Sequence, residues 1–431
     1  MRKSMLTTMA VALPALIAAA VALSTAPDSS ARPHYFEWAT AQKVDEINGN
    51  HADVNTPSLD GCPILSPDGL SLYMASDRPG GRGGLDIWVA RRASEGAPFG
   101  APVNLPPPIN SASADFCPTP VRGGLYFVSR RATSESCGLA DIYFAETDGA
   151  GGWRAPEHLA CDPLGPNGSL DEQGPSLLEA RGKTELYFSR HVPVPPGATP
   201  VPGDIYVSRL GAGGFGPATP VTELNSAASD IQPNIRRDGL EIVFSSDRAG
   251  APGGPDIWAS TRASVGEAWS TPVRLGSNVN TNAAETRPSF SWDARTLLFG
   301  RAPGPEGSSD IYATTREPVR CQIRLLTSPA RMRAKQRTTV TVQVRERGAV
   351  EGEPVARHPV ILRGPGIAVT VRTNMSGTAR VTGVTARRAG RLRATVRAQV
   401  MMSGCTSSKR VLRAVVQAKP AGVRLTGRAA A

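Results

Sequence analysis

Short runs in which apolar and polar residues alternate follow one another along most of the chain. Apolar stretches with helical spacing are few after residue 31. Alternation with a period of two is typical of β-strands, because successive side chains point to opposite faces of a sheet. The pattern therefore predicts an all-β protein.

A phrase made of an acid, two variable residues and a proline recurs five times, at intervals of 55, 57, 58 and 55 residues. Each copy leads into an apolar strand, a tight turn, a second strand, a loop and a third strand that opens on Asp-Ile-aromatic. A short fourth strand follows, as in APVNL (101–105). The phrase begins at Asp60, Asp115, Glu172, Asp230 and Glu285. Four antiparallel strands per repeat form one propeller blade, so the sequence predicts a five-bladed β-propeller.

The fifth repeat lacks a fourth strand of its own. The segment Phe36–Val44 resembles a fourth strand that stands before the first blade, and Ile47-Asn48 follows it much as Ile109-Asn110 precedes the second blade. We expect this segment to pair into blade five and close the ring, since closure removes exposed sheet edges.

The stretch from Asp60 to Trp88 resembles the WD40-like repeat of the TolB family of propellers. It combines acid-x-x-P-x-x-S-P-D-G with LYMASDRPGGRGGLDIW, and blade four has SSDRAGAPGGPDIW at Ser245–Trp258. The resemblance covers about residues 36–317, without a counterpart of the N-terminal domain of TolB. It implies a secreted or periplasmic propeller that is non-catalytic and contacts proteins.

Charge divides the chain near residue 318. Residues 319–431 contain 23 Lys and Arg against three acids, whereas residues 1–318 contain 25 against 34. The phrase from His358 to Val381 resembles bacterial immunoglobulin-like repeats of surface proteins. We therefore expect the propeller over residues 32–318, a strongly basic immunoglobulin-like β-sandwich over 319–418, and a flexible basic tail over 419–431.

Residues 1–31 have the layout of a signal peptide. Basic residues stand at the start, an apolar stretch runs from Met5 to Ala26, and Ser29-Ser30-Ala31 offers a cleavage site. A membrane anchor is the alternative for an apolar run of this length, but polar sequence follows directly. We expect a monomer that is secreted or periplasmic, at the cell envelope, with no membrane span after removal of the signal.

Six cysteines follow the signal, and an even number outside the cytoplasm favours disulfides. The equivalent positions of Cys62 and Cys117 in adjacent blades predict one bridge. The others predicted are Cys137–Cys161 and Cys321–Cys405. No C-x-x-C and no histidine cluster has zinc-ligand spacing, so no metal and no cofactor are expected.

The five acids are expected to circle one mouth of the central channel, because the first strand of a blade lines that channel. The second strand returns an arginine to the same face in each blade: Arg78, Arg131, Arg190, Arg248 and Arg301. Either each acid pairs with the arginine of its own blade and stabilises the repeat, or the ring forms a ligand or cation site.

We predict from these features a non-catalytic binding scaffold, not an enzyme, that contacts an envelope or extracellular protein or a glycan. The alternative is a carbohydrate-active enzyme, a glycosidase-like propeller that uses the channel-mouth carboxylates. Five equivalent acids provide no division into acid and base, and no G-x-S-x-G elbow occurs.

The basic C-terminal part has three possible explanations. One is a coding bias, since 20 of its 23 basic residues are Arg, and another is docking on the acidic propeller. The functional hypothesis is adhesion to an anionic surface polymer such as lipopolysaccharide, a wall polymer or nucleic acid. Alternate arginines would then share one exposed face: Arg387, Arg388, Arg391, Arg393 and Arg397.

Overall fold

The fold is taken from a computed structural model of the chain. It describes Tyr35 and residues 37–49, 53–180, 182–192, 201–251, 253–317, 322–328, 331–333, 336–347, 359–364, 367–374, 378–385, 387, 390–397 and 411–419. The predicted signal peptide and the predicted boundary at residue 318 lie outside these residues. Among the described residues, no helix has the length and apolar character needed to cross a bilayer.

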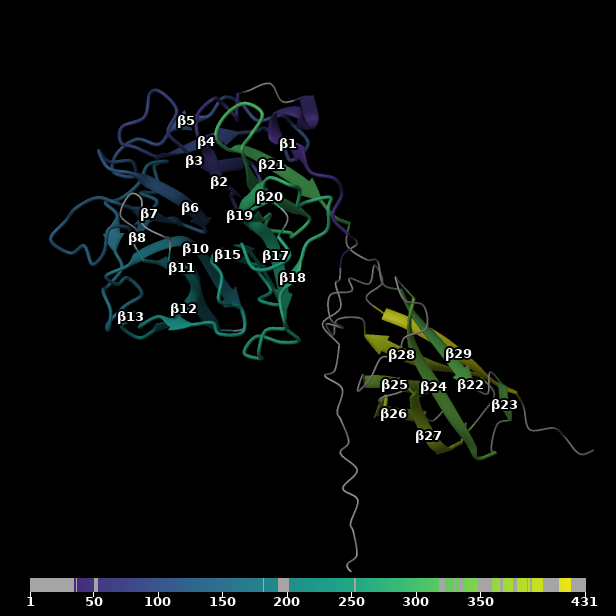
Figure 1. Cartoon of the computed structure of the whole chain (residues 1–431). Coiled ribbons are helices and arrows are strands. Elements are labelled where there is room, and N and C mark those ends of the chain that lie inside the picture. The colour runs from purple at the N-terminus through teal and green to yellow at the C-terminus, as the bar shows by residue number, and fades with distance from the viewer. Residues whose placement is uncertain are drawn as a thin grey trace, which may run out of the picture.

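Five antiparallel sheets form the blades of a propeller, as the repeat predicts (Figure 1). Blade one consists of β2 (Asp60–Leu65), β3 (Ser71–Ser76), β4 (Asp86–Arg91) and β5 (Val103–Asn104). Blade two consists of β6 (Asp115–Val121), β7 (Gly124–Ser129), β8 (Asp141–Glu146) and β9 (Glu157–His158). Blade three consists of β10 (Asp171–Ala180), β11 (Lys183–His191), β12 (Asp204–Gly211), β13 (Gly214–Phe215) and β14 (Thr219–Pro220).

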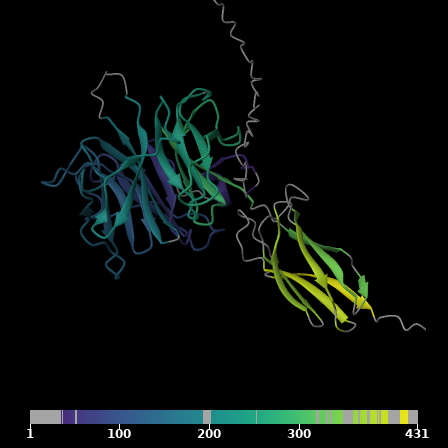
Figure 2. The ribbon, with the colours of Figure 1, turned by 90° about the horizontal axis from the view of Figure 1, so that it is seen from below.

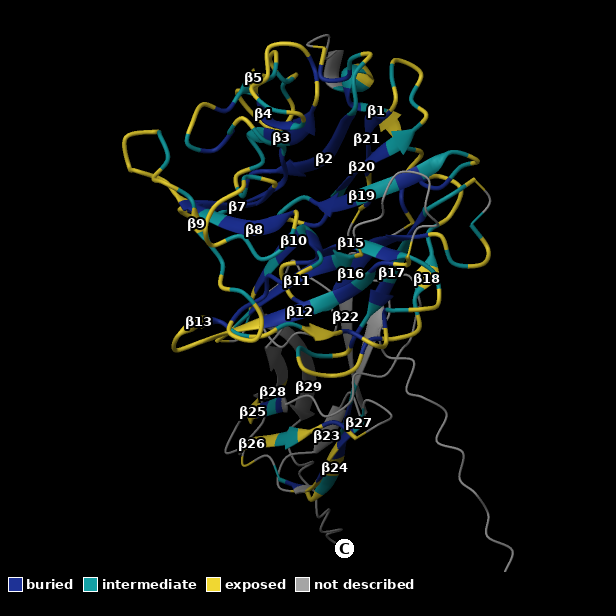
Figure 3. Ribbon diagram, turned by 60° about the vertical axis from the view of Figure 1, so that its left-hand side comes forward, coloured by how far each residue is buried: buried dark blue, intermediate teal, exposed yellow. Residues whose placement is uncertain are grey.

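Blade four consists of β15 (Asp230–Ile235), β16 (Glu241–Ser246), β17 (Asp256–Thr261) and β18 (Val273–Arg274). Blade five consists of β19 (Ala284–Phe290), β20 (Thr296–Ala302), β21 (Asp310–Thr315) and β1 (Gln42–Lys43). The first strands β2, β6, β10, β15 and β19 contact one another in a closed ring around the channel. Figure 3 shows buried residues concentrated in the inner strands and exposed ones in the connecting loops.

Strand β1 supplies the fourth strand of blade five, by antiparallel pairing with β21. A 3-10 helix, η1 (Val44–Gly49), follows it. This pairing is the ring closure that the sequence predicts, but the comparison of Ile47-Asn48 with Ile109-Asn110 is wrong. The equivalent of Asn110 is Asn55, which also stands five residues before the acid of its blade. Asn55 and Asn110 each exchange two hydrogen bonds with the backbone of an isoleucine on the third strand of the preceding blade.

The remaining strands form two further sheets in the C-terminal part, seen in green to yellow in Figure 2. One sheet has β22 (Gln322–Ser328), β24 (Thr338–Arg347) and β27 (Thr378–Val384). The other has β23 (Arg331–Arg333), β29 (Val411–Lys419), β28 (Gly390–Arg397), β25 (Pro359–Gly364) and β26 (Ile367–Arg372). Val342 from the first sheet and Leu362 from the second are fully buried. The likeness to immunoglobulin-like repeats stays a prediction.

Two of the three predicted disulfides are present. Cys62 and Cys117 join blades one and two with 4.9 Å between their Cα atoms, and Cys137 and Cys161 are joined with 5.8 Å. These bridges fit an oxidising compartment. Cys321 and Cys405 lie outside the described residues.

The closing segment is held by an aromatic side chain as well as by β1. Trp38 is buried, stacks against Phe290 at a centroid distance of 6.3 Å, and lies 4.2 Å from the guanidinium carbon of Arg316. Arg316 in turn donates two hydrogen bonds of 2.8 Å to the buried carboxylate of Glu241 in blade four. The segment is therefore fixed to two blades.

Replacement of Trp38 by Ala should lower the free energy of unfolding by about 3–5 kcal/mol, because it leaves a cavity under the closing segment. Urea denaturation followed by circular dichroism measures this loss. The control Val103→Ala removes a side chain that is 58% exposed and should change stability by less than about 0.5 kcal/mol. Equal effects of the two substitutions would contradict the role given to Trp38.

Candidate functional site

The five acids of the repeated phrase lie where the sequence predicts, and each contacts the arginine of its own blade. The carboxylates of Asp60, Asp115 and Glu172 lie 2.6, 2.8 and 2.7 Å from their arginines. Asp230 pairs with Arg248, and Glu285 pairs with Arg301 at 2.8 Å. All five acid side chains are fully buried.

These acids and arginines also form hydrogen bonds with other groups of the protein. Asp115, for example, accepts two further hydrogen bonds from Ser111, of 2.6 Å from the backbone N–H and 2.7 Å from the hydroxyl. Arg131 also donates to the carbonyl of Ile109 and lies 5.2 Å from the ring of Tyr143, the aromatic of Asp-Ile-aromatic. The structure thus brings each acid together with its arginine in a closed cluster. A ligand or cation role for the ring stays a prediction.

The narrow part of the channel is not lined by carboxylates. The described residues around it are cysteines, prolines and small polar residues, with Gln232 and Arg287. Glycoside hydrolysis requires two carboxyl groups that reach the substrate. The channel-mouth acids are buried in ion pairs, so a carboxylate pair has to be sought elsewhere on the propeller.

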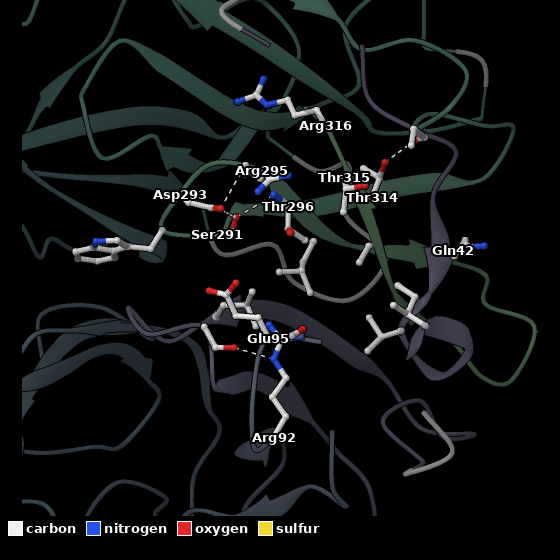
Figure 4. A pocket seen from close by; sticks show the side chains of 18 of the residues that line it. Gln42, Arg92, Glu95, Ser291, Asp293, Arg295, Thr296, Thr314, Thr315 and Arg316 are labelled. Carbon is white, nitrogen blue, oxygen red and sulfur yellow. Dashed lines mark hydrogen bonds between the residues drawn. The ribbon is translucent and has the colours of Figure 1, made fainter. Parts of the chain in front are cut away.

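A larger pocket lies between blades one and five, with a volume of about 630 Å³ (Figure 4). Its walls come from the β2–β3 turn, the β4–β5 loop, the β19–β20 turn and the end of β21. We call it the inter-blade pocket. Its size falls in the range of small-ligand sites. Three exposed carboxylates line it: Glu95, Asp293 and Glu317.

Glu95 and Asp293 stand on opposite walls of the inter-blade pocket, and Figure 4 shows the carboxylate of Glu95 pointing toward the wall that carries Asp293. Arg92 fixes the loop of Glu95, since it donates hydrogen bonds of 2.6 Å to the carbonyl of Glu95 and 2.8 Å to that of Gly69. One oxygen of Asp293 accepts hydrogen bonds of 2.7 Å from the Ser291 hydroxyl and 3.0 Å from a backbone N–H.

Trp292 lines both the inter-blade pocket and a smaller hollow of about 120 Å³. This hollow lies at the end of the channel where turns join the first and second strands of the blades. The guanidinium carbons of Arg237 and Arg122 lie 4.3 and 6.0 Å from its ring centroid. The equivalent turn positions of the other blades are occupied by Pro67, Arg122, Glu179 and Arg237. This position is therefore different in each blade except for the repeated arginine.

These pocket residues were not predicted from the sequence, for different reasons. Glu95 lies in a loop of variable length outside the repeated phrases, whereas Asp293 occupies the same turn position as Asp68 and Asp238 and therefore resembles a turn residue of the repeat. For Trp292 the available signal was a repeat position whose side chain changes from blade to blade. Trp292, which stands where blade one has proline, is the clearest case.

The chain resembles solved structures in fold. No protein-family model matches it, and no curated protein is similar to it in sequence. Solved structures with a similar fold include an α-L-arabinofuranosidase from Lactobacillus brevis, at 12% identity over 61% of this chain and 91% of that chain, with a TM-score of 0.40. A Bacillus subtilis arabinanase has 13% identity over 61% and 95%, with a TM-score of 0.39. A xylotriose-bound GH43_1 enzyme from Xanthomonas citri has 15% identity over 65% and 90%, with a TM-score of 0.40.

These comparisons correct the prediction of a non-catalytic scaffold that is not an enzyme. That prediction was taken from a resemblance to TolB propellers, whereas the solved structures named above are glycoside-cleaving enzymes. A propeller of this kind therefore gives no reason to exclude catalysis, and the inference was wrong. At this identity the likeness extends to the fold alone.

Among the five acids of the repeated phrase, Glu172 makes the stability of the fold depend on pH. Burial raises the pKa of its carboxyl to about 7, although Arg190 and the Gly168 N–H oppose the shift. Because this pKa exceeds the ordinary value of 4.5, the native state binds the proton more tightly than the unfolded chain does. The resulting stabilisation is complete below pH 4.5 and is lost as the pH rises through 7.

We expect the free energy of unfolding of the wild type to fall by about 3 kcal/mol relative to Glu172→Gln between pH 4.5 and 8. The glutamine variant lacks the titrating carboxyl group, so its free energy of unfolding should not show this decrease with pH. Urea denaturation at closely spaced pH values measures both curves. Parallel curves for the two proteins would show that Glu172 keeps an ordinary pKa.

Proposed function

We propose that the protein is carbohydrate-active and hydrolyses a glycosidic bond in the inter-blade pocket. The observation that carries the proposal is the placement of Glu95 and Asp293 on facing walls of one pocket of about 630 Å³, with Trp292 at its edge. Paired carboxyl groups are the usual machinery of glycoside hydrolysis. Trp292, with the Arg237 guanidinium on its ring, adds an aromatic side chain at the edge of the same pocket.

The two carboxyl groups have unlike surroundings, as acid and base roles require. Asp293 accepts hydrogen bonds from Ser291 and the Arg295 N–H, which hold it in one orientation and suit a carboxylate that acts as base or nucleophile. Within the described part of the chain, the Glu95 carboxyl has no hydrogen-bond partner. It is the group that would protonate the leaving oxygen, since it can turn toward the substrate.

Binding and chemistry would thus be divided between the blades. Blade one supplies the proton donor on the β4–β5 loop, and blade five supplies the second carboxylate and Trp292 on the β19–β20 turn. The substrate would lie across the joint between the first and last blades. Export by the predicted signal peptide, which the disulfides fit, would place this activity in the cell envelope or outside the cell.

Hydrolysis of a panel of aryl glycosides and plant and bacterial polysaccharides tests the proposal. On a substrate that the wild type cleaves, Glu95→Gln and Asp293→Asn should each lower kcat by about 10²–10⁴-fold. Trp292→Ala should mainly raise KM, by roughly 2–10-fold, since it removes stacking surface.

The matched control is Glu223→Gln, because Glu223 is an exposed acid on blade three that lines neither pocket. It should keep wild-type kcat and KM. Cleavage that survives both Glu95→Gln and Asp293→Asn would place the chemistry elsewhere, and the absence of cleavage across the panel would contradict the proposal.

We also propose that the basic C-terminal part binds an anionic envelope polymer. Arg363 on β25 and Arg393 on β28 lie directly opposite each other in the sheet, and both are exposed. Like charges in this position repel and destabilise a sheet, so the pair is better explained by an outside polyanion. Arg391 and Arg397 share β28 at alternate positions with Arg393, and Arg387 is exposed. Arg388 lies outside the described residues.

The double variant Arg363→Ala, Arg393→Ala of the full chain should bind lipopolysaccharide or heparin about tenfold or more weakly at low salt, and wild-type binding should weaken steeply as salt rises. The control Arg380→Ala removes an exposed arginine from β27 in the other sheet and should have a smaller effect. Co-sedimentation across a salt series measures the affinities. Salt-insensitive binding would contradict an ionic contact.

A further inference from the structure

The centre of the channel is lined by the third residue of each repeated phrase. These residues have left-handed φ angles of 46°, 47°, 61°, 54° and 57°, and the strand register shifts at this point in every blade. A bulge of this kind re-aims a side chain. The ring consists of Cys62, Cys117, Gly174, Gln232 and Arg287, and all five line a hollow of about 40 Å³.

Arg287 is a cation in this ring that has no counter-ion within the described part of the chain. Its Nε is buried without a hydrogen-bond partner, and no described carboxylate lies within ion-pair distance. Burial lowers the pKa of its guanidinium. The five arginines of the blade clusters, by contrast, all contact an acid. The side-chain oxygen of Gln232, which lines the same hollow from the adjacent blade four, is also buried and unpartnered.

Gly61 of the neighbouring blade one leaves room for the side chain of Arg287. A Cβ at Gly61 would come within 2.3 Å of Nη1 of Arg287, so any other residue there would displace the guanidinium. The Cys62–Cys117 disulfide next to Gly61 forms another wall. The hollow therefore combines a fixed cation, an amide side chain and a sulfur bridge.

Arg287 as a whole is half-buried, but its Nε is buried without a partner. Proteins usually pair a charge that is largely removed from water, or give it a bound ion. A hollow of about 40 Å³ has room for a small ion. We propose that Arg287 binds a small anion at the centre of the channel. Its chemistry is that of a single negative charge the size of chloride or of one carboxylate group. The anion joins blades four and five to the disulfide-linked blades one and two.

Thermal unfolding of the full chain in rising sodium chloride or sodium acetate tests this site. The wild-type Tm should rise by roughly 5 °C when the anion reaches a concentration about 100-fold above its dissociation constant. Arg287→Met should lose this rise. The control Arg82→Met removes an exposed arginine of the β3–β4 loop and should keep it. The chloride and acetate arms separate a halide site from a carboxylate site.

Gly61→Ala keeps the charge but displaces the guanidinium, and should also lose the anion-dependent rise. Broadening of the ³⁵Cl NMR line by the wild-type protein, and its reversal by acetate, reports binding directly and does not depend on the folding of any variant. A rise in Arg287→Met equal to that of the wild type would overturn the proposal, as would the absence of both a Tm rise and line broadening. Neither result bears on hydrolysis, because Glu95 and Asp293 lie outside this hollow.

Discussion

The structure depends on one contact that is repeated around the ring, the hydrogen bonding of an asparagine to the third strand of the preceding blade. Asn110, Asn167, Asn225 and Asn280 make it between consecutive blades, and Asn55 makes it with Ile311 across the join between the first and last blades. Without closure at this join the propeller would be an open array with exposed strand edges. The pairing of β1 with β21 and the packing of Trp38 reinforce the same joint.

The acids and arginines that recur in every blade pair with each other. Each acid neutralises an arginine that lies on the aromatic ring of its own blade, as Glu285, Arg301 and Tyr312 do. The five clusters are buried and their ion pairs are made within the protein, so they contribute stability. Other candidate groups stand at positions where the blades differ. Two such positions are the β-turn that carries Trp292 in blade five and the bulge that carries Arg287.

The backbone of the repeat sets where the residues at the turn of Trp292 and at the bulge of Arg287 lie. The bulge places its residue at the channel in every blade, whether it is a half-cystine, glycine, glutamine or arginine. The tight turn of blades two to five places an arginine, glutamate or tryptophan at one hollow. A repeat fold thus fixes the geometry of a site and leaves its chemistry to single substitutions. This is why the fold by itself did not decide between a scaffold and an enzyme.

The number of blades, the four-stranded repeat, the closing segment and the disulfides Cys62–Cys117 and Cys137–Cys161 could be predicted from the amino-acid sequence. The period of 55 to 58 residues gives the blades, equivalent positions in adjacent blades give the first disulfide, and loops on the same face of blade two give the second. Which other side chains meet across blades is seen only in the folded chain. Glu95 and Asp293 are separated by almost 200 residues, and Arg287 lies beside Gly61 although 226 residues separate them. Ring closure brings the two ends of the repeat together, and no local pattern encodes those contacts.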